Sequence, residues 1–150
     1  MGSDGVNPNT FCIRSTHYRG TVKRPGLVLG LDRGGMCHGR MFRIAPEHAK
    51  AAADALHLRE MVTGVYEPRW LKLRLENGGI ATALAYVADR SHPQYAGKLE
   101  VAEVARRIMA AAGLNGSNID YLKNTVTHLE EMGIHEGNLH RVLRQVELGQ

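Results

Sequence analysis

The feature that most constrains the fold is a change of hydrophobic pattern around residues 58–73, LREMVTGVYEPRWLKL. The preceding residues 46–56, PEHAKAAADAL, are rich in Ala and begin with Pro, which suits the first turn of a helix because its missing N–H costs nothing there. Over residues 65–75 apolar and charged side chains alternate, which is typical of a half-buried strand. The sequence therefore predicts a helix that leads directly into a strand.

Glu60 lies at this junction of helix and strand. A carboxylate at a helix end that abuts an apolar sheet loses part of its hydration, and such a carboxylate is suited to act as a general base. The alternative is a solvated Glu at a frayed helix end, because charged residues are mostly exposed. The local pattern alone leaves both interpretations open.

The length and the cysteine content favour one domain in a reducing compartment. A chain of 150 residues is long enough to bury its own core. It has no run of about 18 apolar residues and no basic segment followed by an apolar run at its start, so we expect neither a membrane span nor a secretory signal. Cys12 and Cys37 form no CxxC pair, which favours reduced thiols and a cytoplasmic protein.

The charge pattern argues against a nucleic-acid partner. The net charge is +4, but no run of Lys and Arg exceeds two residues and aromatic residues make up only 5% of the chain. A surface on which bases stack needs more aromatic side chains, so the pattern favours a solvated basic surface. Such a mildly positive surface also attracts small anions.

The histidines and cysteines do not follow a metal-binding spacing. The chain has 8 His residues but neither an HExxH segment nor paired CxxC segments. Cys12, His17, Cys37 and His38 would have to meet through the fold alone. We expect no metal site.

Most strand patterns precede the helix patterns along the chain. Alternating or apolar runs predict strands over residues 11–16, 27–31, 36–44, 65–75 and 80–88. Apolar stripes at helical spacing predict helices over residues 98–112, from Ser117 to about residue 132, and around 139–146. This order indicates an α+β domain, a partly closed barrel with helices packed on its outside. Residues 1–10 show no periodicity, so we expect a disordered or cloning-derived tail there and one domain over 11–150.

Several segments together resemble one protein family. Residues 59–66, REMVTGVY, are similar to the Arg-Glu-x-x-x-Gly-x-Tyr stretch of the ChaC-like γ-glutamylcyclotransferases, which degrade glutathione. Four further segments agree in the same order: 15–21 (STHYRGT), 24–31 (RPGLVLGL), 92–97 (HPQYAG) and 118–122 (NIDYL). Each is weak alone, but their common order over residues 11–146 is specific. The resemblance implies the γ-glutamylcyclotransferase fold, a mixed and partly closed β-barrel.

The resemblance implies an intramolecular reaction that needs no cofactor. The α-amine of the γ-glutamyl group of glutathione attacks its own side-chain amide carbonyl, which closes 5-oxoproline and releases cysteinylglycine. The enzyme holds the attacking conformer and moves a proton. Glu60 is the implied base, and Ser15, Arg19 and Tyr121 are the implied substrate-binding residues. Arg19 suits a substrate carboxylate because a guanidinium donates two parallel N–H groups.

The chain lacks one motif of the family. The family's Tyr-Gly-Ser-Leu loop, which offers backbone N–H groups to the substrate, does not occur in the 150 residues. We therefore expect a missing N-terminal strand and low activity of the chain as it stands, and an open sheet edge that favours a homodimer. The alternative is a non-catalytic relative that binds γ-glutamyl compounds or a partner protein.

Overall fold

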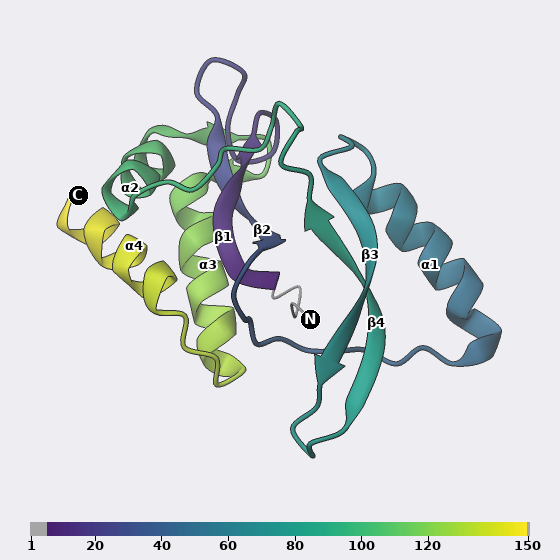
Figure 1. The fold of residues 1–150 in the computed structure, drawn as a ribbon. Coiled ribbons are helices and arrows are strands. Elements are labelled where there is room, and N and C mark those ends of the chain that lie inside the picture. Colours follow the sequence, from purple (N-terminus) through teal and green to yellow (C-terminus); the bar gives the residue numbers. More distant parts are fainter. Residues whose placement is uncertain (1–5, 150) are drawn as a thin grey trace.

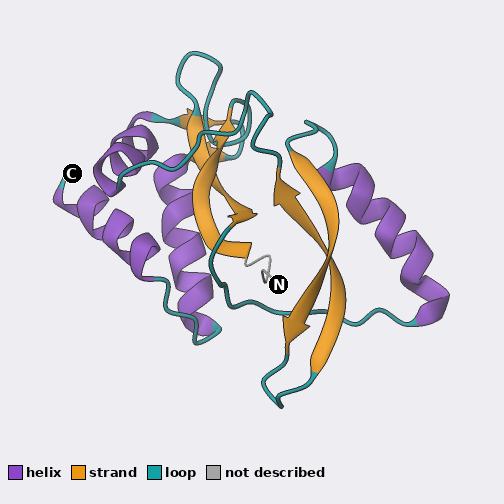
Figure 2. Cartoon of the chain, viewed as in Figure 1, coloured by secondary structure: helices purple, strands orange, loops and turns teal. Residues whose placement is uncertain are grey.

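A computed structural model describes residues 6–149 (Figures 1 and 2). In chain order its elements are β1 (Val6–Ser15), β2 (Gly26–Arg33), α1 (Pro46–Glu60), β3 (Tyr66–Arg74), β4 (Ile80–Ala88), α2 (Val101–Ala110), β5 (Ala112–Gly113), β6 (Gly116–Ser117), α3 (Asn118–Glu131) and α4 (Gly137–Leu148). Among the described residues, no helix has the length and apolar character that a bilayer crossing requires. The α+β class predicted from the sequence is confirmed.

The main sheet consists of two antiparallel strand pairs that meet at one point. Its order is β1-β2-β4-β3, with β1 antiparallel to β2 and β3 antiparallel to β4. β2 and β4 run parallel and share the single residue pair Leu31–Val87. Figure 1 shows the two strand pairs side by side, with α2, α3 and α4 beyond β1 and β2, and α1 beyond β3 and β4. The result is a curled, open half-barrel.

We call β1, β2, α2, α3 and α4 the packed half. α2 and α3 pack on β2, and α4 packs on α2 and α3. In the core that they form, Leu27, Ile108 and Leu122 are all 0% exposed. Burying a Leu or Ile side chain completely contributes roughly 1.5–3 kcal/mol. The helical spacing found in the sequence thus gives this half its core.

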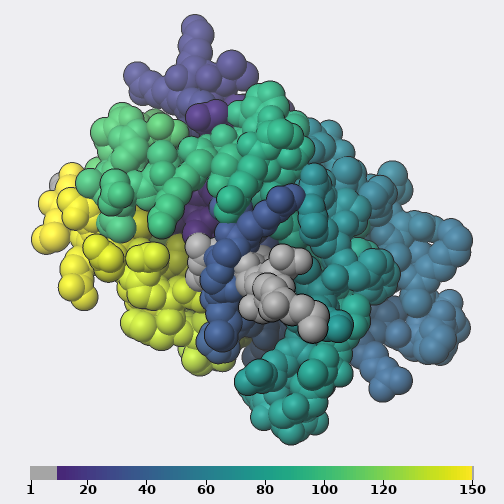
Figure 3. All heavy atoms as spheres, in the orientation of Figure 1, coloured from purple at the N-terminus to yellow at the C-terminus, as the bar shows by residue number. Residues whose placement is uncertain are grey.

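We call α1, β3 and β4 the open half. α1 follows from its Ala content, from Pro46 at its start and from the Lys50–Asp54 pair one turn apart, yet none of its residues is buried. It meets the β3–β4 pair where the His57 Nδ1 lies 3.4 Å from the Tyr86 hydroxyl of β4. Only Ala52, Leu56 and Glu60 along the helix are half-exposed. In Figure 3, α1 and this strand pair stand on the opposite side of the molecule from α3 and α4.

Two expectations from the sequence need correction. β1 begins at Val6, so residues 6–10, expected in a tail, belong to the sheet, where Val6 pairs with Arg33; residues 1–5 of that expected tail lie outside the described residues. Register shifts in this pairing explain why no alternation was visible in residues 6–10.

The predicted strand over 36–44 is absent, and Phe42 there is 82% exposed. The chain bends at Gly34 and Gly35, where φ is 90° and 102°, but the residues after this bend find no strand edge to pair with.

Candidate active site

The four site residues predicted from the sequence come from both halves of the molecule. Ser15 is the last residue of β1, Arg19 lies in the following loop, and Tyr121 lies near the start of α3, all in the packed half. Glu60 is the last residue of α1, in the open half.

The structure brings Ser15, Arg19 and Tyr121 into direct contact. The Ser15 Oγ, on a residue only 8% exposed, accepts a hydrogen bond of 3.0 Å from the backbone N–H of Arg19. The Arg19 guanidinium carbon lies 5.6 Å from the centroid of the Tyr121 ring, within the range of a cation–π interaction. Its Nη1 also donates to the Ser117 carbonyl at 3.2 Å. These contacts fix an arginine head group beside a tyrosine ring.

The first turn of α3 is anchored to the side of β2 that faces away from β1. The Asn118 side chain accepts from the Leu27 N–H at 2.7 Å and donates to the Leu27 carbonyl at 2.8 Å, and Asn118 is 0% exposed. The Tyr121 hydroxyl accepts from the Leu29 N–H at 3.1 Å, and burial raises the pKa of Tyr121. Two side chains thus take the place of a neighbouring strand, and Tyr121 is held firmly.

The loop between β1 and β2 is tight where it passes Arg19. A Cβ atom on Gly20 would lie 2.1 Å from the Gly26 nitrogen, and one on Gly26 would lie 2.2 Å from the Arg19 carbonyl oxygen. Only glycine fits either position, because no side-chain atom tolerates backbone so close. The glycines near Arg19 therefore allow the loop to fold back onto β2.

Glu60 is the last of the three half-exposed residues of α1. Its side chain is 24% exposed, and its Oε1 accepts hydrogen bonds of 2.6 Å and 2.9 Å from the Arg59 guanidinium. The Arg59 side chain itself is 75% exposed. The helix-to-strand junction predicted from residues 58–73 is confirmed, because α1 ends at Glu60 and β3 begins at Tyr66.

Tyr66, the first residue of β3, follows Glu60 closely in the chain but received no role from the sequence. Burial, followed by the charges of Tyr121, Glu60 and Cys12, raises the pKa of Tyr66 to about 12. The phenol of Tyr66 is therefore neutral. The signal was present, since Tyr66 closes the Arg-Glu-x-x-x-Gly-x-Tyr stretch.

A comparison with known families decides the assignment suggested by this arrangement. The family model described as "ChaC-like protein" matches residues 7–148. The chain belongs to the ChaC-like family. Within residues 6–149 no three His, Cys, Asp or Glu side chains converge in the way that metal ligands do.

Two curated relatives of this ChaC-like chain are both named glutathione-specific γ-glutamylcyclotransferases. It is 34% identical over 137 residues to the glutathione-specific γ-glutamylcyclotransferase of Escherichia coli (strain K12), covering 91% of this chain and 59% of that protein. It is 32% identical to glutathione-specific γ-glutamylcyclotransferase 1 of Mus musculus, covering 82% of this chain and 57% of that protein. The chain thus spans less than two thirds of the length of these relatives.

A solved structure shares the fold. The crystal structure of a γ-glutamyl cyclotransferase specific to glutathione from yeast superimposes with a TM-score of 0.76 at 19% identity, covering 97% of this chain and 87% of that one. The γ-glutamylcyclotransferase fold expected from the sequence is thereby confirmed.

Proposed function

We propose that this chain is a glutathione-specific γ-glutamylcyclotransferase, in which Glu60 acts on a substrate bound by Ser15, Arg19 and Tyr121. The observation that supports the proposal is the contact among its binding residues: the Ser15 Oγ accepts from the Arg19 N–H, and the Arg19 guanidinium carbon lies 5.6 Å from the centroid of the Tyr121 ring. The identity to named relatives supports the same reaction class.

Each residue has a distinct task in the proposed reaction. The Arg19 guanidinium pairs with a carboxylate of glutathione, and the ring of Tyr121 fixes the orientation of that guanidinium. Glu60 accepts a proton from the substrate ammonium, and the freed amine attacks the γ-carbonyl carbon to form the ring C–N bond. As the original amide C–N bond breaks, the Glu60 carboxyl returns this proton to the leaving nitrogen of cysteinylglycine and carries over the second proton that the attacking nitrogen loses on ring closure. Cysteinylglycine thus leaves as an ammonium, and 5-oxoproline keeps one N–H. No water or cofactor is consumed, and holding the attacking conformer supplies much of the acceleration.

The carbonyl oxygen of the substrate also needs hydrogen-bond donors as negative charge develops on it. In the resembled family these belong to the Tyr-Gly-Ser-Leu segment, which the 150 residues do not contain. Losing one such donor costs on the order of 10² to 10³ in turnover. We therefore expect a version that carries a strand and a Tyr-Gly-Ser-Leu segment upstream to exceed the 150-residue chain by at least that factor.

The test is the formation of 5-oxoproline and cysteinylglycine from glutathione by both versions. Glu60→Gln keeps the shape of the side chain but cannot take a proton, so turnover should fall by about 10² or more while the melting temperature stays nearly unchanged. Glu47→Gln, an exposed change in the first turn of the same helix, is the matched control and should keep full turnover. Retained turnover in Glu60→Gln would overturn the role of Glu60.

The second candidate function is binding of γ-glutamyl compounds without catalysis, which the lack of a Tyr-Gly-Ser-Leu segment favours. The two candidate functions differ in whether 5-oxoproline is formed from glutathione. A non-catalytic relative binds glutathione in calorimetry yet forms no 5-oxoproline in either version. The enzyme releases both products.

We also propose a homodimer in the cytoplasm. β3 is an edge strand of the sheet order, and a second copy can cover such an edge. Both cysteines are free thiols, which fits a reducing compartment. Light scattering over a hundredfold range of concentration tests the dimer, and a monomer throughout would contradict it.

A further inference from the structure

The junction between the two halves has little backbone pairing where the strand pairs meet. β2 and β4 share one residue pair, Leu31–Val87, and a small apolar cluster of Cys12, Ile13, Val65 and Ala88 lies beside it. Glu60 lies on one side of this junction, and Arg19 and Tyr121 lie on the other. Whatever fixes the junction therefore fixes the distance between the proposed base and the proposed substrate-binding residues.

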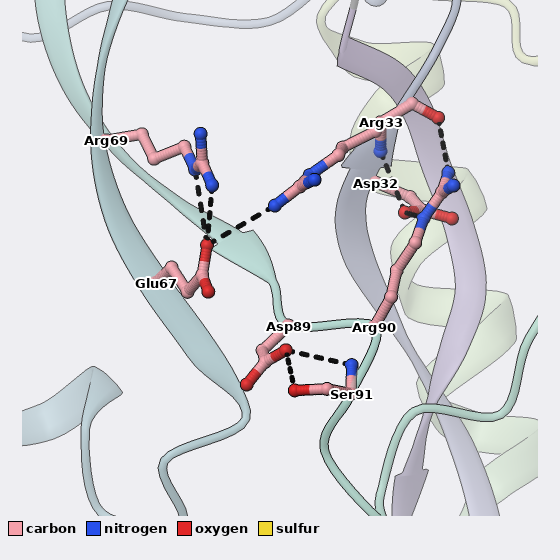
Figure 4. Close-up of polar contacts among 7 residues, drawn as sticks. All are labelled: Asp32, Arg33, Glu67, Arg69, Asp89, Arg90 and Ser91. Atoms are coloured by element: carbon pink, nitrogen blue, oxygen red, sulfur yellow. Dashed lines mark hydrogen bonds and ion pairs between the residues drawn. The ribbon is translucent and has the colours of Figure 1, made fainter.

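One buried carboxylate collects hydrogen bonds from both sides of the junction. Asp32, near the end of β2, is 7% exposed. Its Oδ1 accepts from the Arg90 Nε at 2.8 Å and from the Arg33 N–H at 2.7 Å, and its Oδ2 accepts from the Tyr95 hydroxyl at 2.8 Å. Arg90 lies two residues after the end of β4, so this contact ties the open half to β2 (Figure 4).

The Arg90 head group is held at two points. Besides its bond to Asp32, its Nη2 donates to the Arg33 carbonyl at 2.7 Å (Figure 4). Burial by itself raises the pKa of the Asp32 carboxyl, but hydrogen bonds from Arg90 and Tyr95 outweigh it, so the pKa lies below its usual value. The contact is therefore an ion pair in which a planar guanidinium bridges a side chain and a backbone carbonyl, a geometry that Lys cannot reproduce.

A second contact between the halves is weaker. Arg33 reaches Glu67 of β3 at 3.6 Å, and Arg69 reaches the same carboxylate at 2.7 Å (Figure 4). The side chains of Arg33, Glu67 and Arg69 are 55%, 40% and 45% exposed. Exposed ion pairs contribute little. The Arg90 side chain is also 48% exposed, but the side chain of its partner Asp32 is only 9% exposed, and this buried carboxylate distinguishes the Asp32–Arg90 pair from the Arg33–Glu67 pair.

We propose that Asp32 and Arg90 are positioning residues, which hold the open half against the packed half and so keep Glu60 at its working distance from Arg19 and Tyr121. This inference rests on the proposed function. Neither residue touches the substrate. Loosening the pair should therefore lower kcat, because a base displaced by about 1 Å can cost 10²-fold, while KM changes little because Arg19 and Tyr121 stay within the packed half.

The experiment compares Asp32→Asn and Arg90→Lys with the unchanged protein. All are made either in the 150-residue chain or in the version that carries the upstream Tyr-Gly-Ser-Leu segment, whichever shows the higher turnover. Asp32→Asn keeps the shape and removes the charge, and Arg90→Lys keeps the charge and removes the fork of donors. Glu103→Gln is the matched control, because Glu103 also accepts from arginines, Arg106 and Arg107, but entirely within α2. Thermal melts monitored by circular dichroism establish that each variant is folded.

Two readouts separate the inference from the function on which it rests. Spin labels on cysteines introduced at Ala53 of α1 and Lys123 of α3, both exposed, in a Cys37→Ser background report the distance between the halves without any substrate. We expect a narrow distance distribution in the unchanged protein and in Glu103→Gln. We expect a broad one in Asp32→Asn, with kcat at least tenfold lower and KM within about twofold. Arg90→Lys should give a distance distribution and a kcat between those of the unchanged protein and Asp32→Asn.

Unchanged distances and an unchanged kcat in Asp32→Asn would overturn the inference, and so would a broad distribution with full kcat. If the unchanged protein forms no 5-oxoproline, the proposed function fails. The distance distributions then still decide whether Asp32 and Arg90 hold the two halves together.

Discussion

Each of the helices α2, α3 and α4 buries at least three residues against its neighbours, whereas α1, the longest helix, buries none. In the open half, Leu58, Trp70 and Ile80 are 74%, 72% and 76% exposed. Because apolar burial is the main source of stability, the packed half must supply most of the free energy of folding. The open half carries the proposed base and depends on the junction for its position.

The two halves contribute different functions to the proposed site. Ser15, Arg19 and Tyr121 are fixed by hydrogen bonds and packing inside the stable half, which suits residues that bind a substrate. Glu60 ends a helix with few buried contacts, and such elements open locally at low free-energy cost. Catalysis in this account therefore depends on how well the weaker half is held, and the predictions below test that division.

The largest expected effect is a core truncation in the packed half. Leu122→Ala removes a side chain that is 0% exposed and should lower the free energy of unfolding by about 2–5 kcal/mol. Leu58→Ala in α1 should change it by less than about 0.5 kcal/mol, because that side chain is mostly exposed. Urea denaturation measures both. Equal losses would show that the halves contribute alike.

The next effect concerns the contact that replaces a strand beside β2. Asn118→Ala leaves the buried N–H and C=O of Leu27 without partners, and an unpaired buried group costs about 1–3 kcal/mol. Asn118→Asp keeps the acceptor for the N–H and should lose less stability than Asn118→Ala. Asn77→Ala, at the exposed turn after β3, is the control and should be nearly neutral. If Asn118→Ala is as neutral as Asn77→Ala, the edge of β2 does not need the clamp.

Local signals in the sequence predicted some of these elements and not others. Ala content and Pro46 predict α1, and apolar stripes predict α2 to α4, because helices depend on contacts near in sequence. A strand needs a partner edge, which no local pattern reveals. The apolar-rich run in residues 36–44 therefore predicted a strand that finds no partner, and residues 6–10 pair with β2 although they show no such pattern.

The proposed site likewise could be predicted only in part from the sequence. The motif spacing supplied Glu60, Ser15, Arg19 and Tyr121 only through a family resemblance. The Asp32–Arg90 pair joins residues 58 positions apart, and no spacing rule connects them. Such contacts arise from how the two halves meet, which requires the structure.

The smallest expected effect is a pH dependence confined to the packed half. His140 Nδ1 lies 2.8 Å from the Glu136 carbonyl and Nε2 lies 2.9 Å from the Glu130 carboxylate. Both partners are acceptors, so the pair of bonds requires the protonated ring, and hydrogen bonds to Glu136 and Glu130 raise the pKa of His140.

Because the folded pKa exceeds the unfolded value of about 6.5, the stabilisation is complete below that pH and is lost as pH rises through the folded pKa. His140→Gln should remove this dependence, at a cost below about 1 kcal/mol at pH 6. His128→Gln, whose side chain is 74% exposed, should leave it intact. Urea titrations between about pH 6 and 8 measure both, and an unchanged pH slope in His140→Gln would refute the assignment.

The most direct test of a site shared by two unequal halves is the footprint of glutathione in hydrogen exchange. The Glu60→Gln variant is used in the version that shows the higher turnover before this change, because the substitution prevents conversion of the substrate during the measurement. We predict slower exchange at both sets of amides, those of residues 58–62 at the end of α1 and those of residues 16–20 and 118–121 in the packed half. Protection confined to the packed half, or no protection in either, would contradict the account.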